Sequence, residues 1–240
     1  MKKLINIPER LDPYDTKINP AEKILHISRY EYAAKTIRKL QHNKKTTILD
    51  AACGLGYGSN ILQNQTQFNV VGIDHSSSLV NYLIKKNKNR KIKFIKTDIK
   101  ILPFPDQSID YIVCFETIEH LKKTDGIKTI VEFRRVLKKN GLIIISSPNY
   151  ILTRLIKKIF PKYNNPFHLY EYQPNELEEL LKKNKLQIIE SCGQYFFFPF
   201  IYIFPIFLFF FNFIFKPSKF FPLCLSHYFI ITAKKNYIKI

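Results

Sequence analysis

The sequence is poor in several residue types, and its charges are unbalanced. It has no tryptophan and one methionine, and 38 basic residues against 19 acidic ones give a formal net charge of +19. Only seven of the basic residues are arginine, the side chain that binds phosphate in a bidentate manner. The chain is also rich in lysine, isoleucine and asparagine, as an AT-biased coding sequence would be. The charge therefore favours a compositional origin over a nucleic-acid partner.

Cysteine is scarce, and its spacing excludes a cysteine-based metal site. Cys53, Cys114, Cys192 and Cys224 form no CxxC pair. Most of them lie in apolar runs, where a free cysteine behaves as a small hydrophobic side chain. The first twelve residues, MKKLINIPERLD, have too short an apolar run for a signal-peptide core. Both observations predict a cytoplasmic protein.

Apolar segments alternate with helical patterns along most of the chain. Predicted strands cover 46–52, 68–74, 92–98, 109–116, 141–148, 186–197 and 227–235, and predicted helices cover 20–41, 56–65, 77–89, 125–138 and 173–184. Short continuous apolar strands separated by helices indicate a mostly parallel sheet that is covered on both faces. The sequence therefore predicts a doubly wound α/β fold with its ligand site at the carboxyl ends of the strands.

One long segment has no charge at all. Residues 196–215 (FFFPFIYIFPIFLFFFNFIF) are numerous enough to span about 30 Å as a helix. Two prolines and an asparagine interrupt them, and the strand over 227–235 has to return to the sheet. We therefore favour an element that lies on a membrane surface over a membrane span, with the basic stretch 151–163 beside it. A hydrophobic cap over the sheet edge or a dimer interface is the alternative.

The segment ILDAACGLGYGSN contains the most informative loop. Gly54, Gly56 and Gly58 remove side chains where a ligand approaches the backbone, but the third glycine comes one position too early for a dinucleotide pattern. Asp50 at the strand end would repel a pyrophosphate and suits a ligand with a cationic ammonium group. Asp74 ends the next strand 18 residues after Gly56, where it can accept hydrogen bonds from ribose hydroxyls.

At these residues the chain resembles the class I S-adenosylmethionine-dependent methyltransferases, in particular the small-molecule group with an LPF-x-D-x-S segment. The family loop D-x-G-C-G-x-G appears here as DAACGLG, with Ala52 in place of the first glycine. LPFPDQSIDYIVC and LKKNGLIIISSPN match two further family motifs. The resemblance covers roughly residues 20–190 and implies a Rossmann-like, seven-stranded sheet with S-adenosyl-L-methionine as the cofactor.

The resemblance also implies a set of cofactor-binding residues. In this set Asp74 binds the ribose, Asp98 contacts the adenine, and Arg29 on a helix over the cleft pairs with the methionine carboxylate. The full set is Arg29, Asp50, Ala52, Gly54, Gly56, Asp74, His75, Asp98, Ile99 and Glu116.

Two segments are candidates for the acceptor side of the site. After the fourth strand the chain has FETIEH where nucleobase N-methyltransferases carry [N/D]-P-P-[Y/F], which disfavours that activity. His120 in this segment could act as a general base. A similar Glu-x-x-Glu-His segment in quinone-pathway O-methyltransferases is associated with a divalent metal, so Glu116, Glu119 and His120 could instead bind one. A third interpretation is that Glu119 and His120 only cap the connection to the next helix.

The second segment is NNPFHLYEY. It resembles a segment of sugar- and cell-envelope-related methyltransferases of this family, in which His168 and Glu171 would face the acceptor from a loop. The alternative is that Pro166 and Phe167 only anchor a packed turn before the next helix.

These observations predict an S-adenosylmethionine-dependent methyltransferase with a small-molecule, glycan or lipid-linked acceptor and oxygen as the acceptor atom. His120 and His168 are the predicted catalytic residues, and no metal is assigned. The expected divisions are a helical cap (1–45), the cofactor-binding core (46–195), an aromatic-rich insertion (196–226) and a last strand with a tail (227–240). An RNA methyltransferase and a non-catalytic, membrane-associated cofactor-binding protein are the alternatives. The inner face of the cell membrane is a candidate partner surface, and nucleic acid is disfavoured.

Overall fold

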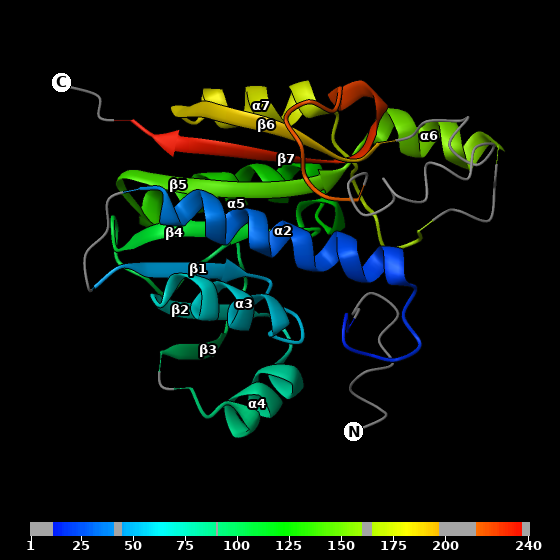
Figure 1. Ribbon diagram of the computed structural model, residues 1–240. Helices are drawn as coiled ribbons and strands as arrows, with labels where there is room; N and C mark the ends of the chain where they lie inside the picture. The colour runs from blue at the N-terminus through cyan, green and yellow to red at the C-terminus, as the bar shows by residue number, and fades with distance from the viewer. Residues whose placement is uncertain (1–11, 41–44, 90, 160–164, 197–214, 237–240) are drawn as a thin grey trace.

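A seven-stranded sheet forms the centre of the computed structural model, which describes residues 12–40, 45–89, 91–159, 165–196 and 215–236 (Figure 1). The strands are β1 (Thr47–Ala51), β2 (Asn69–Asp74), β3 (Ile92–Lys96), β4 (Ile109–Cys114), β5 (Leu137–Pro148), β6 (Leu186–Phe196) and β7 (Ser226–Lys235). Their order is β3-β2-β1-β4-β5-β7-β6. Neighbours from β3 to β5 are parallel, whereas β7 runs antiparallel to β5 and β6. The predicted mostly parallel α/β sheet is confirmed.

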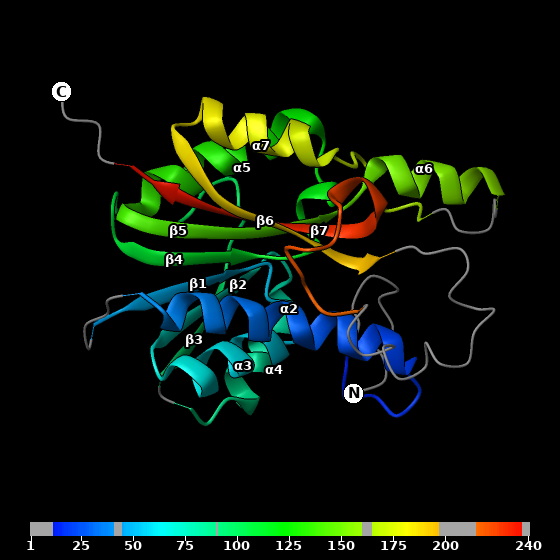
Figure 2. The same cartoon turned by 45° about the horizontal axis from the view of Figure 1, so that its top comes forward.

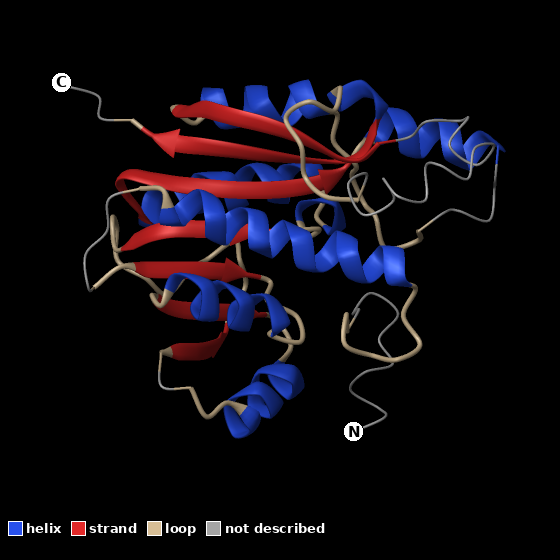
Figure 3. Cartoon of the chain, viewed as in Figure 1, coloured by secondary structure: helices blue, strands red, loops and turns tan. Residues whose placement is uncertain are grey.

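Helices cover both faces of this sheet (Figures 2 and 3). One face carries α2 (Pro20–Arg38), α3 (Tyr57–Thr66) and α4 (Ser77–Lys86), and the other carries α5 (Lys123–Val136) and α7 (Pro174–Lys183). Each layer buries its own apolar cluster: Ala33, Leu62 and Leu79 lie on the first face, and Ile130, Phe133 and Leu177 on the second. Strands buried on both faces explain why the sequence reads as continuous apolar runs.

Local signals in the sequence account for the start of the helix that covers the site. The side chain of Asn19 accepts a hydrogen bond from the backbone N–H of Ala21, and Pro20 occupies the first turn of α2. Both are favoured at these positions because the first N–H groups of a helix have no partner within it. The long helix α2 crosses the sheet face and packs against α3, so its N-terminal half reaches the carboxyl ends of the strands (Figure 1).

Two short 3-10 helices and one further α-helix complete the described chain. They are η1 (Ile118–His120), η4 (Leu223–Leu225) and α6 (Tyr150–Ile159). Most of the uncharged segment 196–215 lies outside the described residues. Within the described part of the chain, no helix is long and apolar enough to cross a membrane. The proposed insertion and the other domain boundaries stay predictions.

Candidate active site

The glycine loop between β1 and α3 provides the floor of the site. Gly54 and Gly56 have left-handed backbones with φ of 52° and 74°, and Ala52 has φ of 59°. An L-residue with a side chain adopts this conformation at a cost of roughly 1–2 kcal/mol, so Ala52 occupies a position better suited to the family's glycine. A Cβ on Gly54 would meet no atom within 4 Å, because this residue borders open space.

The larger of two adjoining cavities lies at the carboxyl ends of β1 to β4. Its volume is about 570 Å³. Seven of the predicted cofactor residues line it. Asp74, His75, Asp98 and Ile99 line this cavity alone, and Ala52, Gly54 and Glu116 border the smaller cavity as well. Asp74 is nearly buried, and one of its carboxylate oxygens accepts the backbone N–H of Ser76 at 2.9 Å. A carboxylate held at the end of β2 is placed to accept ribose hydroxyls.

The smaller cavity, of about 100 Å³, lies under α2. Arg29, His26, Tyr30 and Tyr57 line it together with the loop. Ala52, Gly54 and Glu116 border both cavities, so the two spaces meet there. His26 faces the hydroxyl of Tyr57 at 3.0 Å, and burial, with the Arg29 charge second, lowers the pKa of His26 to about 3. The cavity therefore has a neutral imidazole and one buried cation.

Arg29 supplies that cation. It is 2% exposed, and its Nε donates a hydrogen bond to Oε1 of Gln194 at 2.5 Å. Its Nη1 lies 3.5 Å from Oε1 of Glu116, and its guanidinium stacks 4.4 Å from the ring centre of Tyr228. Glu116 also accepts a hydrogen bond from the hydroxyl of Ser146 at 2.6 Å. These contacts hold Arg29 and Glu116 at the junction of the two cavities.

Two of the predicted cofactor residues, Asp50 and Gly56, line neither cavity. Asp50 is fully buried beneath the loop, where it accepts hydrogen bonds from Ser59 at 2.6 Å and Tyr30 at 3.2 Å. Burial raises the pKa of Asp50 to about 6, although both hydrogen bonds act in the opposite direction. A Cβ on Gly56 would lie 3.0–3.3 Å from Leu83 and Phe94. The geometry gives both residues a supporting role for the loop, and direct ligand contact stays a prediction.

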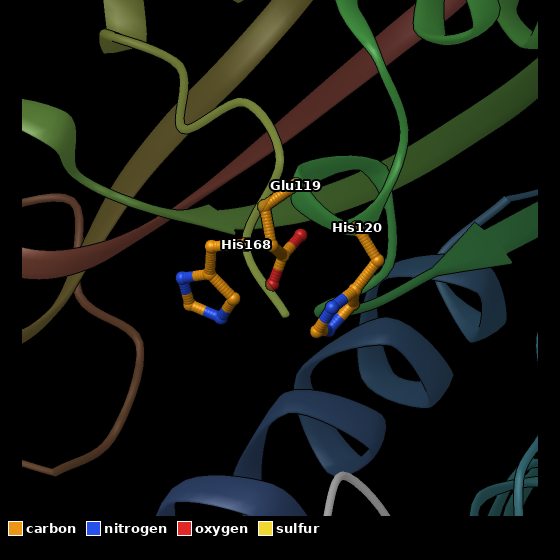
Figure 4. A group of neighbouring side chains, drawn as sticks. All are labelled: Glu119, His120 and His168. Carbon is orange, nitrogen blue, oxygen red and sulfur yellow. The ribbon is translucent and has the colours of Figure 1, made fainter. Parts of the chain in front are cut away.

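The acceptor-side candidates come together around η1 (Figure 4). Glu119, His120 and His168 each offer a potential ligand atom, and these atoms all lie within 4.8 Å of one another. The carboxylate of Glu119 lies between the two imidazoles, whose ring centres are 5.1 Å apart (Figure 4). Of the three residues that the metal interpretation of the sequence would combine, Glu116 points elsewhere, toward Ser146 and Arg29, whereas His168 lies in the cluster with Glu119 and His120.

Glu119 is the most unusual member of this cluster. Its side chain is fully buried, and neither carboxylate oxygen has a hydrogen-bond partner within the part of the chain that the structure describes. Burial, together with the charge of Glu116, raises the pKa of Glu119 well above its usual range. A buried carboxylate without partners is costly, which makes this position a candidate for a bound ion, ligand or water.

The two histidines border different spaces. His120 lines the larger cavity beside Pro166, Phe167 and Leu169, whereas His168 lines a third cavity of about 410 Å³. Nδ1 of His168 lies 2.7 Å from Oε1 of Glu171, which also accepts from Lys157 at 3.2 Å. Burial acts to raise the pKa of Glu171, but these two hydrogen bonds outweigh it and hold that pKa below its usual value. Glu171 is therefore a carboxylate that orients His168.

Several residues that line or support the cavities are not predicted from the sequence. Tyr57 and Phe115 line the smaller cavity, and Gln194, 165 positions from Arg29, holds that arginine. Gln194 is fully buried and donates from Nε2 to the carbonyls of Leu25 and Phe215. The one available signal was a glutamine inside an apolar strand, where a buried amide has to be fully hydrogen-bonded.

The sheet order, the glycine loop and the adjoining cavities define a Rossmann-like protein that binds a nucleoside-containing cofactor. Comparison with known proteins agrees with this class of fold and cofactor. Residues 49–145 match a family model described as a methyltransferase domain. A probable S-adenosylmethionine-dependent methyltransferase of Mycobacterium tuberculosis is 31% identical over 148 residues, which are 62% of this chain and 51% of that protein. The chain thus spans about half the length of the mycobacterial relative.

A second relative and a solved structure point the same way. UbiE of Campylobacter jejuni, a ubiquinone/menaquinone biosynthesis C-methyltransferase, is 27% identical over 172 residues, covering 64% of this chain and 72% of that protein. Magnesium protoporphyrin IX methyltransferase of Synechocystis has the same fold, with a TM-score of 0.65 at 14% identity over 98% of this chain and 92% of that chain. These matches support the predicted group of class I S-adenosylmethionine-dependent methyltransferases and its cofactor, and the solved structure confirms the predicted fold class.

Proposed function

We propose that this chain transfers the methyl group of S-adenosylmethionine to an oxygen atom of a small-molecule or lipid-linked acceptor. The observation that carries the proposal is the junction of the two cavities at Ala52, Gly54 and Glu116. The larger cavity has the carboxylates expected beside an adenosine, and the smaller one has the buried cation expected beside an amino-acid carboxylate. A cofactor that fills both would present its sulfonium near their junction.

The methionyl end of the cofactor matches the smaller cavity in charge. Arg29 is a buried guanidinium whose nearest carboxylate, on Glu116, lies 3.5 Å away, longer than a strong ion pair. A ligand carboxylate can take up the remaining N–H groups of the guanidinium, while Glu116 offers an acceptor for the ligand ammonium. The zwitterion of the amino acid therefore meets a complementary pair of protein charges.

The acceptor enters, in this proposal, between η1 and the loop 165–172. Pro166, Phe167 and Leu169 give this side of the larger cavity an apolar wall, and His120 adds a polar group. Such a wall suits a hydrophobic or lipid-linked acceptor and excludes water from the reacting atoms. In the reaction the acceptor oxygen forms a bond to the methyl carbon, the C–S bond gives its electron pair to sulfur, and the hydroxyl proton leaves the acceptor. The histidines near the wall are the groups placed to assist the loss of that proton.

We propose α6 as an element of a membrane-facing surface. Ile151 and Leu155 are exposed apolar side chains on this helix, and Arg154 and Lys158 are exposed cations among them. Apolar and basic residues on one short helix suit the surface of an anionic bilayer. Sedimentation with vesicles of anionic lipid should remove the wild-type protein from solution, and the double variant Ile151→Ser/Leu155→Ser should stay behind. Equal sedimentation of both proteins would contradict this assignment.

The activity is tested with a labelled methyl group. Purified protein with tritiated S-adenosylmethionine should label fractionated lipid or small-molecule extracts, and mass spectrometry of the product should find an O-methyl group. Asp74→Ala, which removes the carboxylate at the end of β2, should reduce labelling and weaken cofactor binding in parallel. The Asp15→Ala variant, at an exposed position before α2 that lines none of the three cavities, is the matched control. Label that accumulates mainly in RNA, or on a carbon atom, would overturn the proposed acceptor.

A further inference from the structure

We propose that Glu119, His120 and His168 bind one divalent transition-metal ion at the acceptor side of the larger cavity. Binding of the ion does not depend on the proposed function, but the role assigned to the ion rests on it. The three side chains converge from two segments, η1 and the loop 165–172, and potential ligand atoms of all three lie within 4.8 Å of one another. Figure 4 shows the carboxylate between the two imidazole rings. Two imidazoles and one carboxylate around a common point form a recognised type of metal-ligand set.

The buried carboxylate gives independent support for a bound ligand. Glu119 is 0% exposed, and both its oxygens are without hydrogen-bond partners among the described residues. The charges nearest to it include another carboxylate, Glu116, which makes its burial less favourable still. A cation between Glu119 and the histidines would satisfy the carboxylate and remove this cost.

The outer hydrogen bonds of both histidines direct a nitrogen to the shared point. Nδ1 of His120 lies 3.1 Å from the backbone carbonyl of Phe167, and Nδ1 of His168 lies 2.7 Å from the carboxylate of Glu171. Because a carbonyl and a carboxylate only accept hydrogen bonds, each Nδ1 carries the proton, and each Nε2 is left with a lone pair. Imidazole ligands of metal ions are characteristically held in this way, by a carbonyl or carboxylate on the other nitrogen.

Backbone contacts hold the two segments together without a metal. The carbonyl oxygen of Glu119 accepts the N–H groups of Leu169 at 2.8 Å and Tyr170 at 3.0 Å. His168 is therefore held beside η1 although it is 48 residues away from His120 in the chain. The two segments are positioned before the ion arrives, so only the side chains have to close around it, which reduces the ordering cost of binding it.

The donor set selects among cations. Imidazole nitrogen favours zinc, iron and related first-row ions, whereas Mg²⁺ prefers oxygen ligands in an octahedral arrangement. Three protein ligands leave coordination positions free, as in catalytic rather than structural sites. An acceptor hydroxyl bound at such a position would lose its proton to solvent more easily, and its oxygen would then take the methyl group while sulfur retains the C–S electron pair.

The site is tested by metal binding to the full chain, without reference to activity. Protein freed of metal with a chelator is titrated with Zn²⁺, Mn²⁺ and Mg²⁺ by isothermal titration calorimetry. We expect one Zn²⁺ per chain and weaker binding of Mg²⁺. Glu119→Gln and His168→Gln should each weaken Zn²⁺ binding at least about tenfold, because each removes one of three ligands. His75→Gln, at a histidine whose side chain is 82% exposed, is the control for zinc held at the surface.

Each outcome decides for or against the site. Equal binding of Zn²⁺ by wild type and the two cluster variants, or no binding by the wild type, would overturn the proposal. Far-UV circular dichroism and retained binding of S-adenosylmethionine show that the cluster variants are folded. If Glu119→Gln does not fold, the Glu119→Asp variant takes its place, with weakened zinc binding again expected because the shorter side chain retracts the ligand.

Different results would overturn the metal site and the proposed methyl transfer. Zinc binding that the cluster variants lose, without methyl transfer to any extract, would keep the metal site and overturn the proposed activity. Full methyl transfer by chelator-treated protein would keep the activity and overturn the role assigned to the ion, whereas absence of zinc binding by the wild-type protein would overturn the metal site itself.

Discussion

Removal of the buried carboxylate of Asp50 should change how the stability of the protein depends on pH. This side chain is fully buried beneath the glycine loop, and among the described residues its hydrogen-bond partners are the hydroxyls of Ser59 and Tyr30 and no cation. Burial raises its pKa from 3.8 to about 6. Since a tenfold change in proton affinity corresponds to about 1.4 kcal/mol, the shift is equivalent to about 3 kcal/mol of stability.

The direction of this pH dependence follows from whether the folded or the unfolded protein binds the proton of Asp50 more tightly. The folded protein binds this proton more tightly than the unfolded chain, so the contribution is fully present below pH 3.8 and is lost as the pH rises through about 6. Asp50→Asn removes the titration. The free energy of unfolding of the variant, relative to that of the wild type, should therefore rise by about 2–3 kcal/mol between pH values of about 4 and about 7.

Urea denaturation without cofactor, at several pH values in this window, measures the difference. The comparison is made between variant and wild type because other titrating groups then cancel. Asp15→Asn, at an exposed turn position, is the matched control and should change stability by less than about 0.5 kcal/mol at every pH. A constant difference between Asp50→Asn and wild type across the window would refute the account of Asp50 as a carboxylate destabilised by burial.

Three further substitutions test the loop and the smaller cavity. Gly58→Ala should destabilise the fold by about 1–3 kcal/mol and lower the melting temperature, because its Cβ would overlap the ring of Tyr30. An unchanged melting temperature would contradict this packing. Gly54→Ala should destabilise the fold by about 1–2 kcal/mol, because its φ of 52° is strained for alanine. It should also weaken cofactor binding in calorimetry, because Gly54 lines both cavities and its Cβ would meet no protein atom. Arg29→Ala should weaken binding of S-adenosylmethionine at least about tenfold. It should also cost about 1–3 kcal/mol of stability, because the buried side-chain oxygen of Gln194 loses its donor. Normal cofactor affinity would exclude a role for Arg29.

Much of the fold was predictable because buried parallel strands appear in the sequence as short continuous apolar runs. The predicted strand 68–74 is observed as Asn69–Asp74, and the predicted helix 173–184 as Pro174–Lys183. The strand predicted over 141–148 begins earlier, at Leu137, because Leu137 already pairs with Ile109 of β4; Asn140, with φ of 63°, then interrupts the register before pairing resumes at Leu142. No apolar pattern marks residues 138–140, so only pairing with the neighbouring strand could reveal the earlier start.

The cofactor side of the site was partly predictable for a different reason. The loop residues lie next to one another in the chain, and the ends of adjacent parallel strands meet at one edge of the sheet. The order of these residues in the sequence is therefore enough to predict that they lie close together in the fold. Asp50 shows where this reasoning fails. Its place at the end of β1 indicated a ligand contact, but Ser59 and Tyr30 close over it from α3 and α2. The sequence does not reveal which side chains cover a carboxylate.

The acceptor side depends on contacts that no local pattern encodes. The Glu-x-x-Glu-His segment suggests that both glutamates act together, yet Glu116 has φ of 46°, which separates it from the turn that carries Glu119. Its carboxylate then meets Ser146, while Glu119 meets the loop that brings His168. This left-handed residue thus leaves the first glutamate at the junction of the two cavities and the second beside the loop that carries His168. The two carboxylates are consequently expected to respond differently to substitution: loss of Glu116 should affect binding of S-adenosylmethionine, whereas loss of Glu119 should affect binding of the metal ion and leave cofactor affinity intact.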